Sequence, residues 1–313
     1  MNSSYTLALR AAHEACAAQH YPQGALYVLA TPIGNLADIS LRALHLLDLA
    51  DSIACEDTRH GGALLRGYGI AKSASQLLAL HEHNEAQACA QVLLRLQAGQ
   101  RVALVSDAGT PAISDPGNRL VAAARDAGHP VLALPGASSV TAALSIAGVQ
   151  QQTGAKDGFL FAGFLPSRAK EREAAIAALA LESRSIVLLE APHRIDELAQ
   201  ALATLGARTL TLARELTKQF EQTHTLRADA LHDWLAQDPM RRKGEFVLVL
   251  HAQAPEERAN DALRVLHLLL QELPLKSAVD LAAEITGASR KALYAAALAA
   301  RKSDGAAPED EKS

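Results

Sequence analysis

The stretch Arg101-Val-Ala-Leu-Val-Ser-Asp-Ala-Gly-Thr-Pro-Ala-Ile-Ser-Asp-Pro-Gly117 joins a short apolar run to a long turn rich in polar residues, glycine and proline. Residues 101–106 are typical of a buried strand, and the residues that follow Gly117, as far as Ala127, have the pattern of a helix. Open α/β sheets bind ligands at the carboxyl ends of their strands. The stretch therefore predicts a strand, a ligand-binding turn and a helix.

Similar units occur on both sides of this stretch. Apolar runs that are typical of strands lie at residues 25–31, 52–55, 77–80 and 131–134. Helical patterns begin near Ser40, Asn84 and Ser138, and Asn84 with Gln87 three places on is typical of a helix cap. Strands that alternate with helices predict right-handed βαβ units and a mainly parallel sheet.

A second α/β region follows the polar segment 150–158. Its strands are predicted at residues 159–164, 185–189, 209–213 and 246–250, with helices at 170–180 and 195–205. Beyond Pro255 the pattern is helical only, with helices at 257–272, 276–285 and from 290, the last two joined by a glycine-containing turn as in a helix-turn-helix. We predict an N-terminal extension (1–23), a first lobe (24–150), a second lobe (151–254), a helical domain (255–302) and a disordered tail (303–313).

Composition narrows the class of protein. The chain has 313 residues, 49% of them hydrophobic, and no apolar stretch long enough to span a membrane. Three cysteines lie far apart without a paired motif, which favours a reducing, cytoplasmic location, and the first residues do not resemble a signal peptide. A net charge of −4 and 4% aromatic residues argue against a protein that coats nucleic acid.

Three glycine-bearing strings follow predicted strands in the first lobe: Thr31-Pro-Ile-Gly-Asn35, Asp107-Ala-Gly-Thr-Pro111 and Pro135-Gly-Ala-Ser-Ser139. Glycine lets a backbone approach a ligand closely, and free amides there can bind a carboxylate or a ribose. Each string alone could be a plain turn or a helix cap, but together they favour a ligand site. Because none is a GxGxxG or a P-loop, NAD and ATP are disfavoured.

Charged strings follow other strands. Glu56-Asp-Thr-Arg-His60 places two acids, a hydroxyl and two bases in five residues, which is typical of a functional loop. His81-Glu-His-Asn-Glu85 lacks the HExxH spacing, so we predict a substrate-facing polar cluster and no metal. Glu190-Ala-Pro-His-Arg194 and Ala213-Arg-Glu-Leu-Thr-Lys218 could form surface salt bridges or the second wall of a cleft.

These strings together resemble the ribosomal RNA small subunit methyltransferase I family, within the tetrapyrrole methylase superfamily. The resemblance is carried by residues 30–40, 55–59, 81–84, 106–117, 135–139 and 190–194, and extends over about Gly24 to the end of the second lobe. The terminal helices also resemble that family's C-terminal domain. The fold class that this implies is α/β, a two-lobed tetrapyrrole-methylase-like fold with a small C-terminal helix-turn-helix domain.

The resemblance also implies a function. It implies S-adenosyl-L-methionine bound between the lobes and 2′-O-methylation of a decoding-centre cytidine of 16S rRNA, on the small ribosomal subunit, by a homodimer. The cofactor contacts that it implies are Ile33, Gly34, Asp107, Ala108, Gly109, Pro111, Ser138, Ser139, Glu190, Ala213 and Glu245.

For the chemistry, Glu56 or Asp57 is the candidate general base and Arg59 a phosphate ligand, although Glu82 or a water could replace the base. The candidate RNA contacts are His81, Glu82, Arg194, Arg214, Lys218, Lys276, Arg290 and Lys291. Two alternatives stay open. A methylase of tetrapyrrole ring carbons would share the two lobes, and a non-catalytic nucleic-acid-binding protein would use only the helix-turn-helix.

Overall fold

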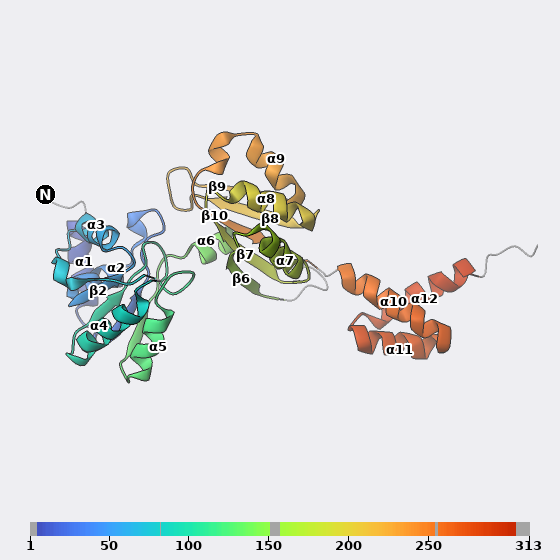
Figure 1. The fold of residues 1–313 in the computed structure, drawn as a ribbon, viewed down its shortest axis with the longest axis horizontal. Coiled ribbons are helices and arrows are strands. Elements are labelled where there is room, and N and C mark those ends of the chain that lie inside the picture. Colours follow the sequence, from blue (N-terminus) through green and yellow to red (C-terminus); the bar gives the residue numbers. More distant parts are fainter. Residues whose placement is uncertain (1–4, 82, 151–156, 254–255, 305–313) are drawn as a thin grey trace, which may run out of the picture. The chain divides into compact units, whose positions relative to one another are not determined.

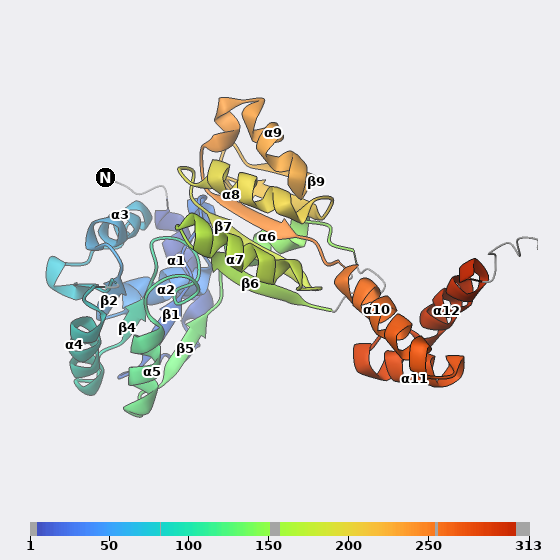
Figure 2. The same ribbon diagram turned by 45° about the vertical axis from the view of Figure 1, so that its right-hand side comes forward.

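The computed structural model describes residues 5–81, 83–150, 157–253 and 256–304 (Figures 1 and 2). The chain forms two compact units. The first consists of residues 1–148, 161–165 and 187–250, and the second of residues 149–160, 166–186 and 251–313. In the described part, no helix has the length and apolar character that a membrane span requires.

The first sheet has the strand order β3-β2-β4-β1-β5 and all its recorded pairs are parallel. Its strands are β1 (Leu26–Leu29), β2 (Ser52–Cys55), β3 (Leu77–Ala79), β4 (Val102–Leu104) and β5 (Val131–Leu134). Tyr27 of β1 lies opposite Ala103 of β4 and Leu132 of β5. Because β1 and β4 are neighbours, the two glycine-bearing turns that follow them begin side by side. The predicted parallel sheet is confirmed.

Helices cover both faces of this sheet. They are α1 (Thr6–Cys16), α2 (Leu41–Leu49), α3 (Thr58–Tyr68), α4 (Glu85–Gln97) and α5 (Asn118–Asp126), with short 3-10 turns at Leu36–Asp38 and Ala74–Gln76. Helix α6 (Ser139–Ile146) follows β5 and packs against residues 246–250 of the second sheet. Alternate strand residues point to opposite faces. Tyr27 and Ile53 pack in a core with α1, α2 and α3, whereas Leu26 and Ala54 pack in a second core with α4 and α5.

Two local predictions need correction. Helix α3 begins inside the string Glu56–His60, which we expected to be a loop, because the Asp57 side chain caps the helix by accepting from the Arg59 amide at 2.8 Å. Asn84 precedes α4 but makes no side-chain cap. Its Oδ1 instead accepts from the His81 amide at 2.9 Å and its Nδ2 donates to the Ala79 carbonyl at 3.0 Å, so it closes the turn after β3.

The second sheet has the order β6-β7-β10-β8-β9, and β8 is antiparallel to both of its neighbours. Its strands are β6 (Phe159–Phe164), β7 (Ser185–Glu190), β8 (Thr209–Arg214), β9 (Gln222–Arg227) and β10 (Phe246–Leu250). The intervening helices are α7 (Ala169–Ala180), α8 (Ile195–Leu202) and α9 (Leu231–Ala236), with 3-10 turns at Ala203–Leu205, Ala228–Ala230 and Pro239–Arg242. Strand β9 was not predicted, because this edge strand is mostly polar.

The last helices are α10 (Glu256–Glu272), α11 (Leu275–Thr286) and α12 (Arg290–Asp304). They pack around a small core of their own that includes Leu266, Val279 and Leu293. Gly287 ends α11 with a φ of 68°, in the left-handed region that glycine adopts without steric cost. The predicted helix-turn-helix is confirmed as the fold of this part.

Candidate functional site

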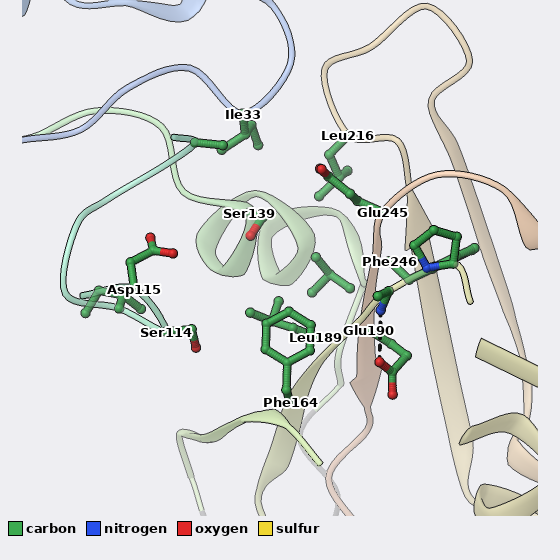
Figure 3. A pocket seen from close by; sticks show the side chains of 15 residues that line it. Ile33, Ser114, Asp115, Ser139, Phe164, Leu189, Glu190, Leu216, Glu245 and Phe246 are labelled. Atoms are coloured by element: carbon green, nitrogen blue, oxygen red, sulfur yellow. Dashed lines mark hydrogen bonds between the residues drawn. The ribbon is translucent and has the colours of Figure 1, made fainter. Parts of the chain in front are cut away.

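A pocket of about 400 Å³ lies in the first compact unit (Figure 3). It has the size of a small-molecule site. Its lining residues are Ile33, Ala108, Ile113, Ser114, Asp115, Ser139, Phe164, Leu189, Glu190, Ala191, Pro192, Leu216, Glu245, Phe246 and Val247. Figure 3 shows Ser114 and Asp115 on one side and Glu190 and Glu245 on the other. Loops at the ends of strands from both sheets therefore supply the walls.

Two of these loops contain strained backbone. Among the described residues, the non-glycine residues with positive φ are Ala112 (66°) and Ser114 (67°) in one loop, and Glu215 (54°) and Thr217 (65°) in the other. Each such residue costs of order 1–3 kcal/mol and persists only where the surrounding structure holds it in place. Both loops line the pocket, which makes the strain a second indication of function.

Backbone hydrogen bonds join the turns after β1 and β4. The Thr31 amide donates to the Gly109 carbonyl at 2.8 Å, and the Gly109 amide donates to the Thr31 carbonyl at 3.0 Å. The Thr31 hydroxyl donates to the Ser106 carbonyl at 3.1 Å, and Gly109 has a φ of 85° that favours glycine. This link holds Ile33 and Ala108 at the pocket.

The structure brings part of the predicted cofactor set together. Ile33, Ala108, Ser139, Glu190 and Glu245 line the pocket. The other predicted cofactor residues do not line it; they are Gly34, Asp107, Gly109, Pro111, Ser138 and Ala213.

Two residues of this second group support the segments that do line the pocket. Ala213 is buried in β8 and pairs with Val247, a lining residue. Gly34 faces Thr217 and Lys218 so closely that a Cβ there would lie 2.9 Å from the Thr217 Oγ1. Glycine at position 34 therefore allows the loops of the two sheets to meet beside the pocket.

The pocket also contains a carboxyl that the sequence analysis did not assign. Burial, followed by the nearby charge of Glu56, raises the pKa of Asp115 to about 6. Burial and the charges of Asp107 and Asp57 raise the pKa of Glu56, while His81 lowers it. Asp115 was present in the diagnostic stretch 106–117, but only the folded loop shows that it faces the pocket and lies near Glu56.

Asp57 is poorly suited to be a general base. Hydrogen bonds from the Arg59 side chain hold the pKa of Asp57 well below its usual range. The Arg59 Nη2 lies 2.6 Å from the Asp57 Oδ2, and the guanidinium is otherwise exposed. Asp57 therefore caps α3 and pairs with Arg59. His81 is half-buried and its Nδ1 has no hydrogen-bond partner within the described part, while Glu82 lies outside the described residues.

The prediction that Arg194, Arg214 and Lys218 are available to phosphates needs correction. The Arg194 Nη2 donates to the Leu165 carbonyl at 2.5 Å, and its Nε lies 3.2 Å from the Glu190 Oε1.

Arg214 is 9% exposed and donates from Nη1 to the carbonyls of Met240 (3.1 Å) and Lys243 (2.9 Å). The Lys218 Nζ contacts Glu215 at 2.8 Å and Glu245 at 3.0 Å. Glu190 and Glu215 are close to their partners in sequence, whereas the carbonyls of Leu165, Met240 and Lys243 and the carboxylate of Glu245 come from other segments. The cations hold the second wall of the pocket together.

The three remaining predicted RNA contacts lie on the terminal helices of the second unit. Lys276 on α11 and Arg290 and Lys291 on α12 are exposed. The Arg290 Nε lies 3.5 Å from the Asp280 Oδ1, a surface pair. Their exposure leaves them accessible to a polyanion. In the parts of the chain that the structure describes, no group of three or more His, Cys, Asp or Glu could hold a metal ion.

Comparisons with known proteins give the family. A model of tetrapyrrole (corrin/porphyrin) methylases matches residues 25–231, and a model of the RsmI C-terminal HTH domain matches residues 256–301. The chain is 49% identical over 280 residues to ribosomal RNA small subunit methyltransferase I of Escherichia coli O157:H7, covering 88% of this chain and 95% of that protein. It is 47% identical to the protein of that name from Pseudomonas aeruginosa, covering 88% and 97%.

Solved structures show the fold. Cobalt precorrin-4 methyltransferase has a TM-score of 0.53 at 18% identity, covering 73% of this chain and 97% of that one. Diphthine synthase has a TM-score of 0.55 at 16% identity, covering 72% and 89%. The identities to the first group of relatives are high and extend over nearly their whole length. The chain therefore belongs to the ribosomal RNA small subunit methyltransferase I family, within the tetrapyrrole methylases.

Proposed function

We propose that this chain transfers a methyl group from S-adenosyl-L-methionine to the ribose 2′-hydroxyl of a decoding-centre cytidine in 16S rRNA, on the small ribosomal subunit in the cytoplasm. The observation that carries the proposal is the pocket between the loops that contain Ala108 and Glu245, in a chain of this methyltransferase family. A homodimer is part of the proposal.

The pocket residues fit such a donor. Leu189, Pro192 and Ile33 provide an apolar surface for an adenine ring, and Ser139 and Glu190 provide polar atoms for ribose hydroxyls and amino groups. When bound, S-adenosylmethionine supplies a methyl group already activated by its sulfonium. The lining side chains would bind this donor and orient its methyl group.

The chain's own contribution to the chemistry is alignment and proton removal. Positioning alone can supply much of the rate of an in-line displacement. The proton of the 2′-hydroxyl needs an acceptor, and a carboxyl whose pKa is raised toward the working pH is a better acceptor than an ordinary one. Glu56 meets this condition although it does not line the pocket, and Asp115, which does line it, is a second carboxyl with a raised pKa. Glu56 is the proposed general base.

The RNA is held outside the pocket in this proposal. Lys276, Arg290 and Lys291 present cationic groups on the terminal helices, and Arg59 presents an exposed guanidinium that is paired with Asp57. Phosphate contacts position a nucleic acid without reading its sequence. Because the chain as a whole has a net charge of −4, attraction to RNA phosphates has to come from local groups of cations such as these.

Methylation of a tetrapyrrole ring carbon is the second candidate. The likeness to cobalt precorrin-4 methyltransferase supports it only at the level of fold. The match of residues 256–301 to the RsmI C-terminal HTH domain favours RNA, because a tetrapyrrole is small enough to need no additional helical domain.

The test offers radiolabelled S-adenosylmethionine with 30S subunits that lack the modification and, separately, with a uroporphyrinogen-type substrate. Label in 16S rRNA at one nucleotide that resists alkaline cleavage supports the proposal. Label in the tetrapyrrole alone contradicts it. Ala108→Phe should fill the pocket and abolish both cofactor binding and labelling, whereas Ala86→Phe on the exposed side of α4 should change neither. Sedimentation of the purified protein tests the homodimer.

A further inference from the structure

Phe220 is the most exposed aromatic side chain in the described part of the chain, with 68% of its surface accessible. It lies in the loop of residues 215–221, which connects β8 to β9 and contributes Leu216 to the pocket. Figure 3 shows Leu216 at the pocket and the backbone of its loop leading away from it. When a partner covers an apolar ring that is exposed to this degree, the burial favours binding of that partner.

The loop that carries Phe220 is tightly held. The Lys218 amide donates to the Glu215 carbonyl at 3.0 Å, and the Glu221 amide donates to the Lys218 carbonyl at 3.1 Å, so two turns follow one another. The Glu221 carboxylate accepts from the Thr217 amide at 2.6 Å and closes the second turn. Phe220 is therefore presented by an ordered loop.

Contacts outside the loop fix its position at the pocket. The Asn35 amide donates to the Thr217 Oγ1 at 3.1 Å, which ties the loop to the turn after β1. The Lys218 Nζ contacts Glu245, another lining residue. Because Phe220 is four residues from Leu216, the two Cα atoms are at most about 14 Å apart. The ring thus lies within reach of nucleotides that flank the target.

The charges of the loop indicate which part of an RNA would meet it. Glu215 and Glu221 of the loop, together with Glu245 beside it, outnumber Lys218, so phosphates are disfavoured there. Unpaired bases are commonly recognised in RNA by stacking on an aromatic ring, a contact that needs no cation. We infer that Phe220 stacks on an unpaired base next to the target nucleotide of the RNA substrate. This inference rests on the proposed function.

The experiment measures methylation of 30S subunits by Phe220→Ala and by the wild-type chain. Loss of a base-stacking contact should raise the KM for 30S subunits about 5- to 150-fold. The Kd for S-adenosylmethionine and the melting temperature should stay unchanged, because the ring is exposed and lines no part of the pocket. Phe159→Ala is the matched control, since that ring is 48% exposed on β6, and should leave the KM unchanged.

Conservative variants separate stacking from a general apolar contact. Phe220→Trp and Phe220→Tyr should keep a KM close to that of the wild type, whereas Phe220→Leu should resemble Phe220→Ala. The ratio of KM values between Phe220→Ala and wild type should not change between 50 and 200 mM salt, because counterion release affects phosphate contacts and not stacking.

Four results overturn the inference. A KM unchanged in Phe220→Ala, or fully restored in Phe220→Leu, removes the stacking role while the proposed function stands. A Phe220→Ala variant that sediments as a smaller species than the wild type assigns the ring to a contact between copies of the chain. If the wild-type chain leaves 16S rRNA unlabelled, the proposed function itself fails.

Discussion

The Nδ1 of His60 lies 2.9 Å from the Oδ2 of Asp107, so the first turn of α3 is joined to the loop that follows β4. Both segments border the group of carboxyls around Glu56 and Asp115. The hydrogen bond links two strings that lie 47 residues apart in the sequence.

The first prediction concerns this pair. The hydrogen bond to Asp107 raises the pKa of His60. Because the folded-state pKa is raised, the bond stabilises the fold below the unfolded-state pKa, and this stabilisation is lost as the pH rises through the folded-state value. In an NMR titration, His60 should titrate above an ordinary histidine, and Asp107→Asn should lower its pKa. An identical titration in the variant would show that the bond is absent in solution.

The second prediction separates Glu56 from Asp57. Glu56→Gln should lower kcat on 30S subunits about 10²- to 10⁴-fold, because the proposed general base is lost. Asp57→Asn should keep most of the activity, since asparagine also caps helices. In the wild type, kcat should rise with pH through the raised pKa of Glu56. Equal losses in both variants would mean that the string acts through its fold and not through a base.

The third prediction concerns the cost of Asp115. Its folded-state pKa of about 6 lies above the usual value. Ionisation of Asp115 therefore opposes folding once the pH exceeds the pKa of aspartate in the unfolded chain. Asp115→Asn should raise the free energy of unfolding by about 1 kcal/mol at pH 8, a value reduced for partial solvent exposure. Below pH 4 the gain should vanish. Urea unfolding at the two pH values measures it, and a variant less stable than the wild type at pH 8 would contradict the prediction.

The fourth prediction tests the structural role of Arg214. Its guanidinium is buried and donates to two backbone carbonyls. Arg214→Ala leaves these carbonyls without their donor and should lower the free energy of unfolding by about 2–3 kcal/mol. The control is Arg227→Ala, which removes an exposed arginine from β9 and should have no measurable effect on unfolding. A stable Arg214→Ala with weak RNA binding would restore the original phosphate prediction.

The fifth prediction concerns the terminal helices. Replacing Lys276, Arg290 and Lys291 together by glutamine should weaken 30S binding and reduce the slope of log affinity against log salt by about 2 in magnitude. Deleting the chain from Pro255 should weaken 30S binding at least as much. Neither change should alter the Kd for S-adenosylmethionine, since no residue of these helices lines the pocket. Equal loss of both affinities would give the helices a structural role.

The strands of the first sheet could be predicted from sequence because a buried parallel strand is a continuous apolar run with a turn at its end. The runs at 25–31 and 52–55 contain β1 and β2, and the helix-turn-helix follows from helical spacing around Gly287. These are local properties of the chain. Polar elements gave no such signal: β9 consists mostly of polar residues, and α3 begins inside a charged string.

The sequence by itself therefore determined the apolar strands of the two sheets, the family resemblance and most of the loops that carry polar groups. Only the tertiary structure decided which groups meet. Gly34 faces Thr217, Arg214 is buried against the carbonyl of Met240, and Asp115 faces the pocket. The physical reason is that burial and nearby charges set the partner and the pKa of a polar side chain. Residues distant in sequence supply both at this site.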